Sequence, residues 1–231
     1  MSDAMASNGS DHGTRPTVRF RGERRWPMAL AVLVAAILQI IVPHRGRIPG
    51  WYLFPVLEIV LLACIVIADP GRIDKRSPAL RTGTIALIAV MTVANSLGAV
   101  LLMYDIVATV RGINPTNLLG RGALIWVTNV IVFSLWYWEF DRGGPAERAA
   151  GSERWASFAF PENATPELVP EGWMPTYPDY LYLSFTNSTA FSPTDTLPVR
   201  MWAKMTMLVQ SVIALVTAIL VIARAVNVLP G

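Results

Sequence analysis

The residues best placed to do chemistry form a polar cluster near the C-terminal end: Ser192, Thr194 and Asp195, with Thr189 shortly before them. Their hydroxyl and carboxylate oxygens could coordinate a hydrated cation or a polar solute along a pore. Two prolines bracket Asp195, so this carboxylate could equally accept hydrogen bonds from the backbone amides of a turn. The residue types leave both interpretations open, and the four residues are the pore-lining candidates.

A second candidate is Glu58, which would lie about 10 Å into a helical apolar stretch that begins at Trp51. A carboxylate inside hydrocarbon is costly and is by default a candidate for function. Glu58 could pass a proton, bind a cation or pair with a basic side chain. It could also pack in its protonated form with a purely structural role, and the sequence does not separate these alternatives.

Four amide side chains each lie inside a different apolar stretch: Gln39, Asn95, Asn129 and Gln210. Hydrogen bonds between such side chains on neighbouring membrane helices contribute roughly 0.6 to 2 kcal/mol each. We therefore interpret these amides as contacts between helices rather than as solute ligands.

Other chemistries find no support in the residue pattern. The lone cysteine, Cys64, allows neither an intrachain disulfide nor a cysteine-based metal site, and His12 and His44 lack further ligands at metal-binding spacing. No P-loop, dinucleotide fingerprint, HExxH or GxSxG motif is present. We expect no cofactor, no metal and no enzymatic activity.

Composition indicates a membrane protein. The chain has 231 residues, of which 53% are hydrophobic and 15% charged, and its mean hydropathy is +0.45. An ordinary soluble domain carries about 25% charged residues, so the apolar residues must meet lipid. The net charge of +3 does not indicate nucleic-acid binding, because the arginines lie mostly beside the hydrophobic stretches.

Five hydrophobic segments define the membrane part: 26–42, 51–68, 82–107, 118–138 and 205–226. Each has close to the roughly 20 residues that a helix needs to cross about 30 Å of hydrocarbon. Within lipid each must be helical, because only a helix satisfies its own backbone within one segment. Tryptophan and tyrosine near the segment ends fit the headgroup region.

The remaining boundaries follow from composition. Residues 1–25 form a disordered basic tail, residues 26–138 hold four spans, and residues 139–176 form a cap outside the membrane that its aromatic residues help to order. Residues 177–199 begin with a helix of about 15 Å, half a bilayer, and prolines then stop it, which predicts a re-entrant segment. Residues 200–231 carry the last span.

The distribution of lysine and arginine sets the orientation. Five arginines precede the first span, four basic residues follow the second and three follow the fourth, whereas the other two connectors have two each. Because basic residues are retained on the cytoplasmic side, we expect the N-terminus and the cap to be cytoplasmic in a multi-pass protein of the plasma membrane.

The re-entrant stretch resembles the pore module of tetrameric potassium channels. In an ungapped comparison Thr189 falls on the threonine before the filter, Asp195 on the filter aspartate and Pro198 on the downstream proline. The resemblance implies that 118–138 and 205–226 correspond to the outer and inner helices. Residues 190–194, AFSPT, stand where the filter has T-V-G-Y-G. Both filter glycines are absent, which argues against selective potassium conduction by the known geometry.

Nearly the whole chain also resembles a bacterial family of uncharacterised integral membrane proteins, a domain of unknown function. The similarity rests on four spans, the sequence FSLWYWEFDRGGP at the end of the fourth, a Pro-Asp-Tyr entry and a single last span. This resemblance brings no established activity.

The fold class expected is an all-α membrane protein with five transmembrane helices plus a re-entrant half-helix and pore-like loop before the last. The primary functional hypothesis is a channel-like or pseudo-channel subunit that contacts the lipid bilayer, forms a homo-oligomer and takes a monovalent cation. The alternatives are a structural or partner-binding membrane protein and a small proton-coupled carrier that uses Glu58.

Overall fold

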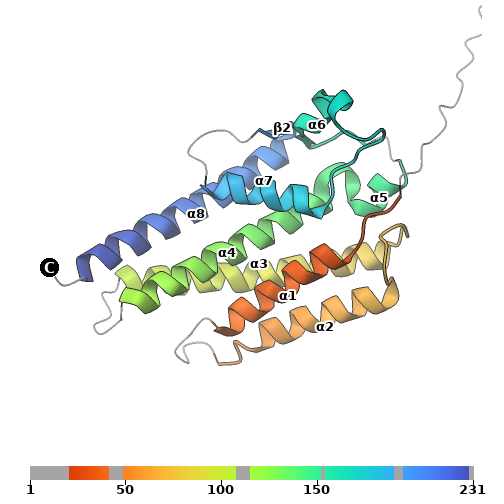
Figure 1. Ribbon diagram of the computed structural model, residues 1–231. Coiled ribbons are helices and arrows are strands. Elements are labelled where there is room, and N and C mark those ends of the chain that lie inside the picture. Colours follow the sequence, from red (N-terminus) through yellow and green to blue (C-terminus); the bar gives the residue numbers. More distant parts are fainter. Residues whose placement is uncertain (1–20, 42–48, 108–114, 152–153, 190–194, 229–231) are drawn as a thin grey trace, which may run out of the picture.

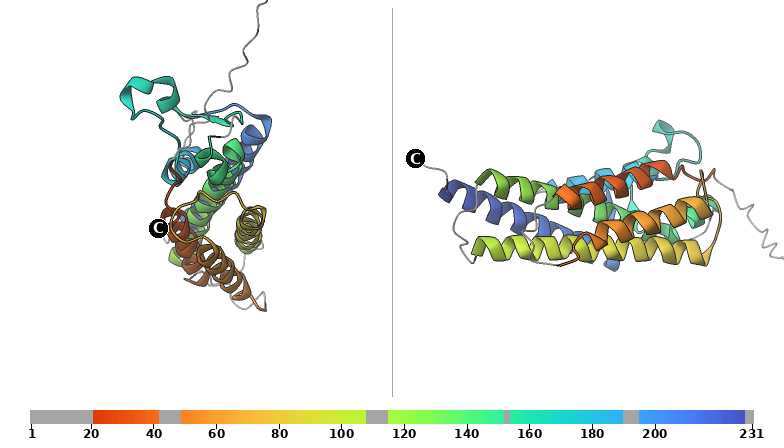
Figure 2. Two further views of the ribbon diagram at one scale, coloured as in Figure 1. Left: turned by 90° about the vertical axis from the view of Figure 1, so that its right-hand side faces the viewer. Right: turned by 90° about the horizontal axis from the view of Figure 1, so that it is seen from below.

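The protein is a bundle of helices that run roughly along one long axis (Figures 1 and 2). The computed structural model describes residues 21–41, 49–107, 115–151, 154–189 and 195–228. The bundle helices are α1 (Trp26–Ile41), α2 (Leu53–Ala68), α3 (Pro78–Val107), α4 (Pro115–Phe140), α7 (Tyr177–Thr189) and α8 (Met201–Val228). Short elements connect α4 to α7 and α7 to α8: η1 (Asp141–Gly143), α5 (Pro145–Ala149), β1 (Phe158–Ala159), α6 (Pro161–Ala164), η2 (Pro166–Leu168) and β2 (Leu197–Pro198).

Helix α4 is the centre of the bundle, because it packs against α1, α3, α7 and α8. Its buried Leu135, Tyr137 and Trp138 belong to the main hydrophobic core. Towards the other end of α4, a Cβ atom on Gly122 would lie 2.7 Å from a methyl group of Val221 on α8. The small residue therefore permits the close approach of two long helices.

Three of the described helices are long and apolar enough to cross a membrane: Pro78–Val107, Asn117–Gly143 and Met201–Ala223. The other two apolar helices, α1 and α2, have 16 residues each, or about 24 Å at 1.5 Å per residue. They are shorter than a full span. The structure thus has three helices with the length and apolar character of a span, and the expectation of five transmembrane helices stays a prediction.

The outer faces of the bundle are apolar. Large hydrophobic side chains are exposed along α1, α2, α3 and α8, for example Ile40, Ile67, Val100 and Ile222. A water-soluble monomer rarely exposes contiguous apolar surface on this scale. The surface is compatible with the membrane location that the composition predicts.

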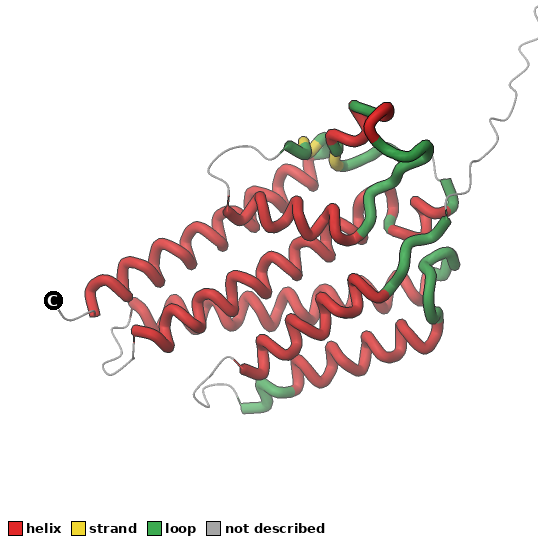
Figure 3. The backbone as a smooth tube through the Cα atoms, viewed as in Figure 1, coloured by secondary structure: helices red, strands yellow, loops and turns green. Residues whose placement is uncertain are grey.

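Most of the described loops gather at the end of the bundle opposite the C-terminus (Figure 3); this end is called the cap end below. Here β1 pairs antiparallel with β2, with Phe158 opposite Pro198, and the amide of Val199 donates to the carbonyl of Ser157 at 2.8 Å. Phe158 and Phe160 of the cap are buried, whereas Trp155 is 80% exposed.

Helix α7 begins in this cap with a side-chain cap. The carboxylate of Asp179 accepts hydrogen bonds from the amide of Thr176 at 2.7 Å and from its hydroxyl at 2.9 Å. This is the half of a capping box in which the acidic side chain three residues into the helix pairs with the backbone amide at the helix start. The Pro-Asp pair therefore fixes where α7 starts, at Tyr177.

Candidate functional site

The predicted pore-lining residues are only partly described. Ser192 and Thr194 lie outside the described residues. Thr189 is the exposed last residue of α7, and its hydroxyl donates to the carbonyl of Phe185 at 3.1 Å. Asp195 is exposed where the described chain resumes. No contact among these four residues is described, so the polar cluster stays a prediction.

The inner face of α7 is held by a hydrogen-bond network centred on Gln210 of α8. The Gln210 Nε2 atom donates to the hydroxyl oxygens of Ser184 at 2.6 Å and Ser188 at 2.7 Å. Its Oε1 atom accepts from the Tyr137 hydroxyl at 2.5 Å and from the Asn187 amide at 2.8 Å. The buried side chain of Gln210 thus joins α4, α7 and α8.

Further polar contacts extend along α7. The Ser184 hydroxyl donates to the carbonyl of Val130 on α4 at 2.7 Å, and the Tyr177 and Ser134 hydroxyls lie 2.9 Å apart. The Asn187 amide also donates to the carbonyl of Met207 on α8 at 3.0 Å. We call Tyr137, Ser184, Asn187, Ser188 and Gln210 the α7 cradle.

The α7 cradle fixes a half-length helix between two long ones. Its amides and hydroxyls point at one another, and unpaired polar groups there would be costly in an apolar environment. The interpretation of Gln210 as a contact between helices is in keeping with these distances. Asn129 behaves differently, because it is buried and neither of its amide atoms has a hydrogen-bond partner among the described residues.

Glu58, the second candidate, is fully buried between α1 and α2. The Gln39 Nε2 atom donates to both of its carboxylate oxygens, at 2.9 and 3.0 Å. Two polar residues that the sequence presents separately are therefore partners. The contact gives Glu58 a structural role, and its use as a proton carrier stays a prediction.

A buried charge network lies where α4, α5 and α7 meet the segment before α1. The Arg148 guanidinium donates to the Glu23 carboxylate at 3.0 Å and to the carbonyl of Trp138 at 2.7 Å. The Asp141 carboxylate accepts from the Tyr180 hydroxyl at 2.7 Å and from the Ser157 amide at 2.6 Å. Glu23, Asp141, Arg148 and Tyr180 are called the buried charge network.

This network keeps Arg148 charged. Burial alone would lower the pKa of the guanidinium, but Tyr180, Glu23 and Asp141 raise it, and the net effect is a pKa above the ordinary value. The Tyr180 ring also lies 5.1 Å below the guanidinium carbon, at a distance suited to a cation–π contact. Arg148 is therefore a fixed positive charge that organises the cap end.

This network was not predicted from the sequence. Arg148 was one of the three arginines taken to set the orientation after the fourth span, and Glu23 had no expected role. The available signal was Glu23 itself, an acidic residue among Arg21, Arg24 and Arg25 immediately before an apolar stretch. Arg121 was counted in the same way, yet it forms a buried ion pair with Asp105 at 2.9 Å.

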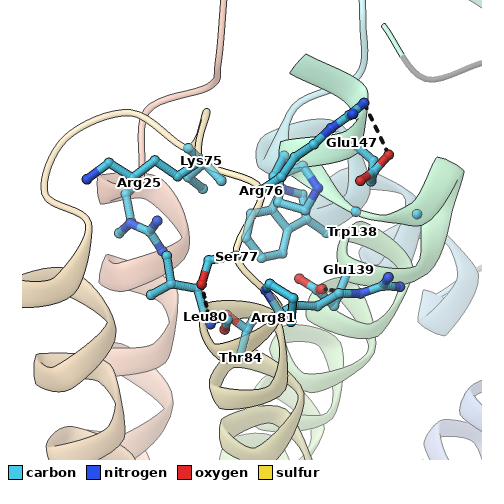
Figure 4. A pocket seen from close by; sticks show the side chains of 16 residues that line it. Arg25, Lys75, Arg76, Ser77, Leu80, Arg81, Thr84, Trp138, Glu139 and Glu147 are labelled. Atoms are coloured by element: carbon cyan, nitrogen blue, oxygen red, sulfur yellow. Dashed lines mark hydrogen bonds and ion pairs between the residues drawn. The ribbon is translucent and has the colours of Figure 1, made fainter. Parts of the chain in front are cut away.

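A cavity of about 250 Å³ opens at the cap end between the α2–α3 connector and the α4–α5 corner. Figure 4 shows Lys75, Arg76 and Arg81 around it, with Glu139 and Glu147 opposite. Arg76 lies 3.4 Å from the Glu147 carboxylate and Arg81 lies 3.5 Å from Glu139. These ion pairs are looser than the charge-assisted hydrogen bonds of the buried network, and they leave donors free at the rim.

The fold and site together define a helical protein with apolar outer faces, a half-length helix enclosed by two long helices, and a charged cap end. Comparisons with protein-family models, with curated proteins and with solved structures give no match. The two resemblances described from the sequence therefore stay expectations.

Proposed function

We propose that this chain is a subunit of an oligomeric membrane protein in which residues 177–199 of each copy form a pore-type hairpin. The function is that of a channel-like or pseudo-channel subunit. One observation carries the proposal: α7 ends after 13 residues, between α4 and α8, and the chain then returns to the end from which α7 started.

The return is established at both ends of α7. At its start, the Tyr177 amide donates to the Glu23 carboxylate at 2.9 Å, within the cap end. After its end, β2 lies beside β1, and Val199 bonds to Ser157, whose amide contacts Asp141. Tyr180, in the first turn of α7, contacts the same Asp141 carboxylate. The segment before α7 and the segment after it therefore lie at the same end of the bundle.

A hairpin of this kind favours an oligomer. In a membrane, non-helical backbone at depth must be buried in protein or line a water-filled space. On the outward side of α7, Tyr182 is 60% and Phe185 48% exposed. Further copies of the chain around a common axis would cover these aromatic faces and enclose the return segment.

The α7 cradle supports a rigid hairpin whose narrow part would come from the segment after Thr189. Asp195 would then face the solute, which we propose to be a monovalent cation. A filter without the two glycines cannot stack its carbonyls as a potassium filter does, so low selectivity or a closed pseudo-channel is expected.

The test combines oligomer detection with ion flux. Cys64 is exposed on α2 and is first replaced by alanine so that it cannot react. In this Cys64→Ala background, Tyr182→Cys should form cross-links between copies of the chain in native membranes. In proteoliposomes of the full chain, Asp195→Asn should change cation flux, whereas Glu171→Gln, an equal charge loss in the exposed cap, should not. Cross-linking without flux would define a pseudo-channel, and the absence of both would refute the proposal.

A further inference from the structure

Two cavities at the cap end share Arg81 and Gly143 but differ in charge. The 250 Å³ cavity described above carries Glu139 and Glu147 next to its basic residues. The second, of about 390 Å³, has four arginines in its lining, Arg81, Arg142, Arg154 and Arg200, and the described residues contribute no carboxylate to that lining. We call this second cavity the arginine cleft.

Two of the four arginines of the cleft have no described anionic partner, whereas Arg81 pairs with Glu139 at 3.5 Å. Among the described residues Arg154 and Arg200 have neither an ion pair nor a hydrogen-bonded acceptor. The Arg142 Nε atom lies 3.9 Å from the Asp141 carboxylate, beyond hydrogen-bond reach, and that carboxylate is already held by Ser157 and Tyr180. The cleft therefore presents two guanidinium groups, those of Arg154 and Arg200, for which the described part of the chain supplies no anion.

The position of Arg154 is fixed by the backbone beside it. Gly143 has a φ of 86° and lies so close to Arg154 that an added Cβ would be 2.9 Å from the Arg154 Cδ and Nη1 atoms. Absence of a side chain at this turn lets the guanidinium stem pack against η1. Arg154 is thus held at the cleft rather than extended into solvent.

Apolar side chains adjoin the same cleft. Trp155 and Phe140 line it, and Val199 and Met201, on either side of Arg200, are exposed. The Phe140 ring also contacts Trp202 on α8, with centroids 5.7 Å apart. Aromatic rings beside arginine at the end of membrane helices are typical of the headgroup level of a bilayer.

We propose that the arginine cleft binds the headgroup phosphate of an anionic phospholipid. Guanidinium groups bind phosphate oxygens through paired N–H donors. A lipid fits better than a soluble phosphate compound because the acyl chains would follow the exposed apolar surface from Val199 and Met201 along α8. The arginine-rich side of a membrane protein also faces the leaflet that carries anionic lipids.

Native mass spectrometry of the full-length protein in detergent tests the proposal. The probes are phosphatidylglycerol, phosphatidylcholine and glycerol phosphate, added separately at matched concentrations. The variant Arg154→Gln with Arg200→Gln should lower affinity for phosphatidylglycerol about 30-fold, because each arginine near an anionic lipid contributes roughly fivefold. Both side chains are exposed, so the fold should be unaffected.

The matched control removes the same charge at the same end of the molecule through Arg21→Gln with Arg24→Gln, two exposed residues outside the cleft. Preferential phosphatidylglycerol binding that only the cleft variant loses supports the site. An equal loss in the control, or undiminished binding by the cleft variant, overturns it. Full displacement of the lipid by glycerol phosphate at equal concentration would overturn the assignment to a lipid in favour of a soluble phosphate.

Discussion

Arginines at the cap end occupy two contrasting environments a few residues apart. In the buried charge network, Arg148 has three oxygen acceptors within 3.0 Å and is almost inaccessible to solvent. In the arginine cleft, Arg154 and Arg200 are exposed, and no carboxylate of a described residue lies in the lining around them. The same residue type therefore builds the fold in one place and leaves an unneutralised surface in the other.

The α7 cradle belongs with the first environment. Its amide and hydroxyl groups are saturated by one another, which leaves little capacity to bind a solute. Saturated polar groups hold helices together, whereas unsaturated charges can recruit a ligand. This contrast is in keeping with our proposals, which assign ligand binding to the cleft and the return segment rather than to the inner face of α7.

The largest expected effect comes from Arg148→Met. The substitution leaves the buried carboxylates of Glu23 and Asp141 without their cation, and breaking a buried charge pair in this way costs about 3 to 5 kcal/mol. The matched change Arg154→Met should alter the free energy of unfolding by no more than about 0.5 kcal/mol in either direction. Unfolding in detergent, followed by circular dichroism, measures both, and similar losses for the two variants would contradict the contrast.

Next in size is Gln210→Leu, which removes the centre of the α7 cradle. The substitution removes a hydrogen-bond partner from Tyr137, Asn187 and two serines. Each unpaired buried group costs about 1 to 3 kcal/mol, but some of these groups can form new hydrogen bonds with one another. We therefore expect the free energy of unfolding to fall by about 3 kcal/mol. Ser211→Ala, which removes a single bond of 3.2 Å to the Asn187 carbonyl, is the control and should cost about 0.5 kcal/mol. If Gln210→Leu leaves the free energy of unfolding unchanged, packing alone holds α7 between α4 and α8.

The sequence predicts the helical, apolar character of this molecule because hydropathy is a local property. It also predicts a short helix that starts at the Tyr177-Pro178-Asp179 signal, and the structure has α7 there, from Tyr177 to Thr189. The segment ends shift by a few residues: α3 begins at Pro78 rather than 82, and α8 at Met201 rather than 205. In both helices the added first turn is mostly apolar and ends in a basic residue, Arg81 or Lys204, which is where the expected span boundary was drawn.

Pairings between distant residues could not be read from the sequence. Glu23 and Tyr177 are 154 positions apart and meet only because α1 and α7 start at the same end. Arg121 looks like a flanking charge until Asp105 is placed beside it. The arginine cleft likewise requires β2 to bring Arg200 next to Arg154. Charge counting reveals that the cap end is basic but not which arginines are neutralised.

A third prediction concerns Glu58 and Gln39. Glu58→Leu leaves the Gln39 amide without the acceptor it holds at 2.9 Å, and a loss of about 2 kcal/mol in the free energy of unfolding is expected. A double-mutant cycle with Gln39→Leu should give a coupling of about 0.6 to 1.7 kcal/mol. Zero coupling would show that the two side chains do not depend on each other in the folded protein.

The same position tests the carrier alternative. Glu58→Gln keeps a hydrogen-bonding side chain at a site where the Gln39 amide is the neighbour, so the protein should fold. If pH-dependent uptake of a solute exists and persists in this variant, Glu58 does not carry the proton. Loss of uptake with an unchanged free energy of unfolding would favour the carrier over the pore.

The smallest expected effect has the opposite sign. Four arginines line one cleft to which the described residues contribute no carboxylate, and like charges at this spacing repel one another. Arg154→Gln with Arg200→Gln should therefore raise the free energy of unfolding in lipid-free detergent by up to about 0.5 kcal/mol at low ionic strength. The gain should vanish above about 0.1 M salt, where the Debye length falls to about 10 Å. Added phosphatidylglycerol should make the parent more stable than the variant, because the lipid stabilises only the chain that retains both arginines. A variant less stable than the parent without lipid would mean that the arginines have protein partners, and the distinction between the two environments would fail.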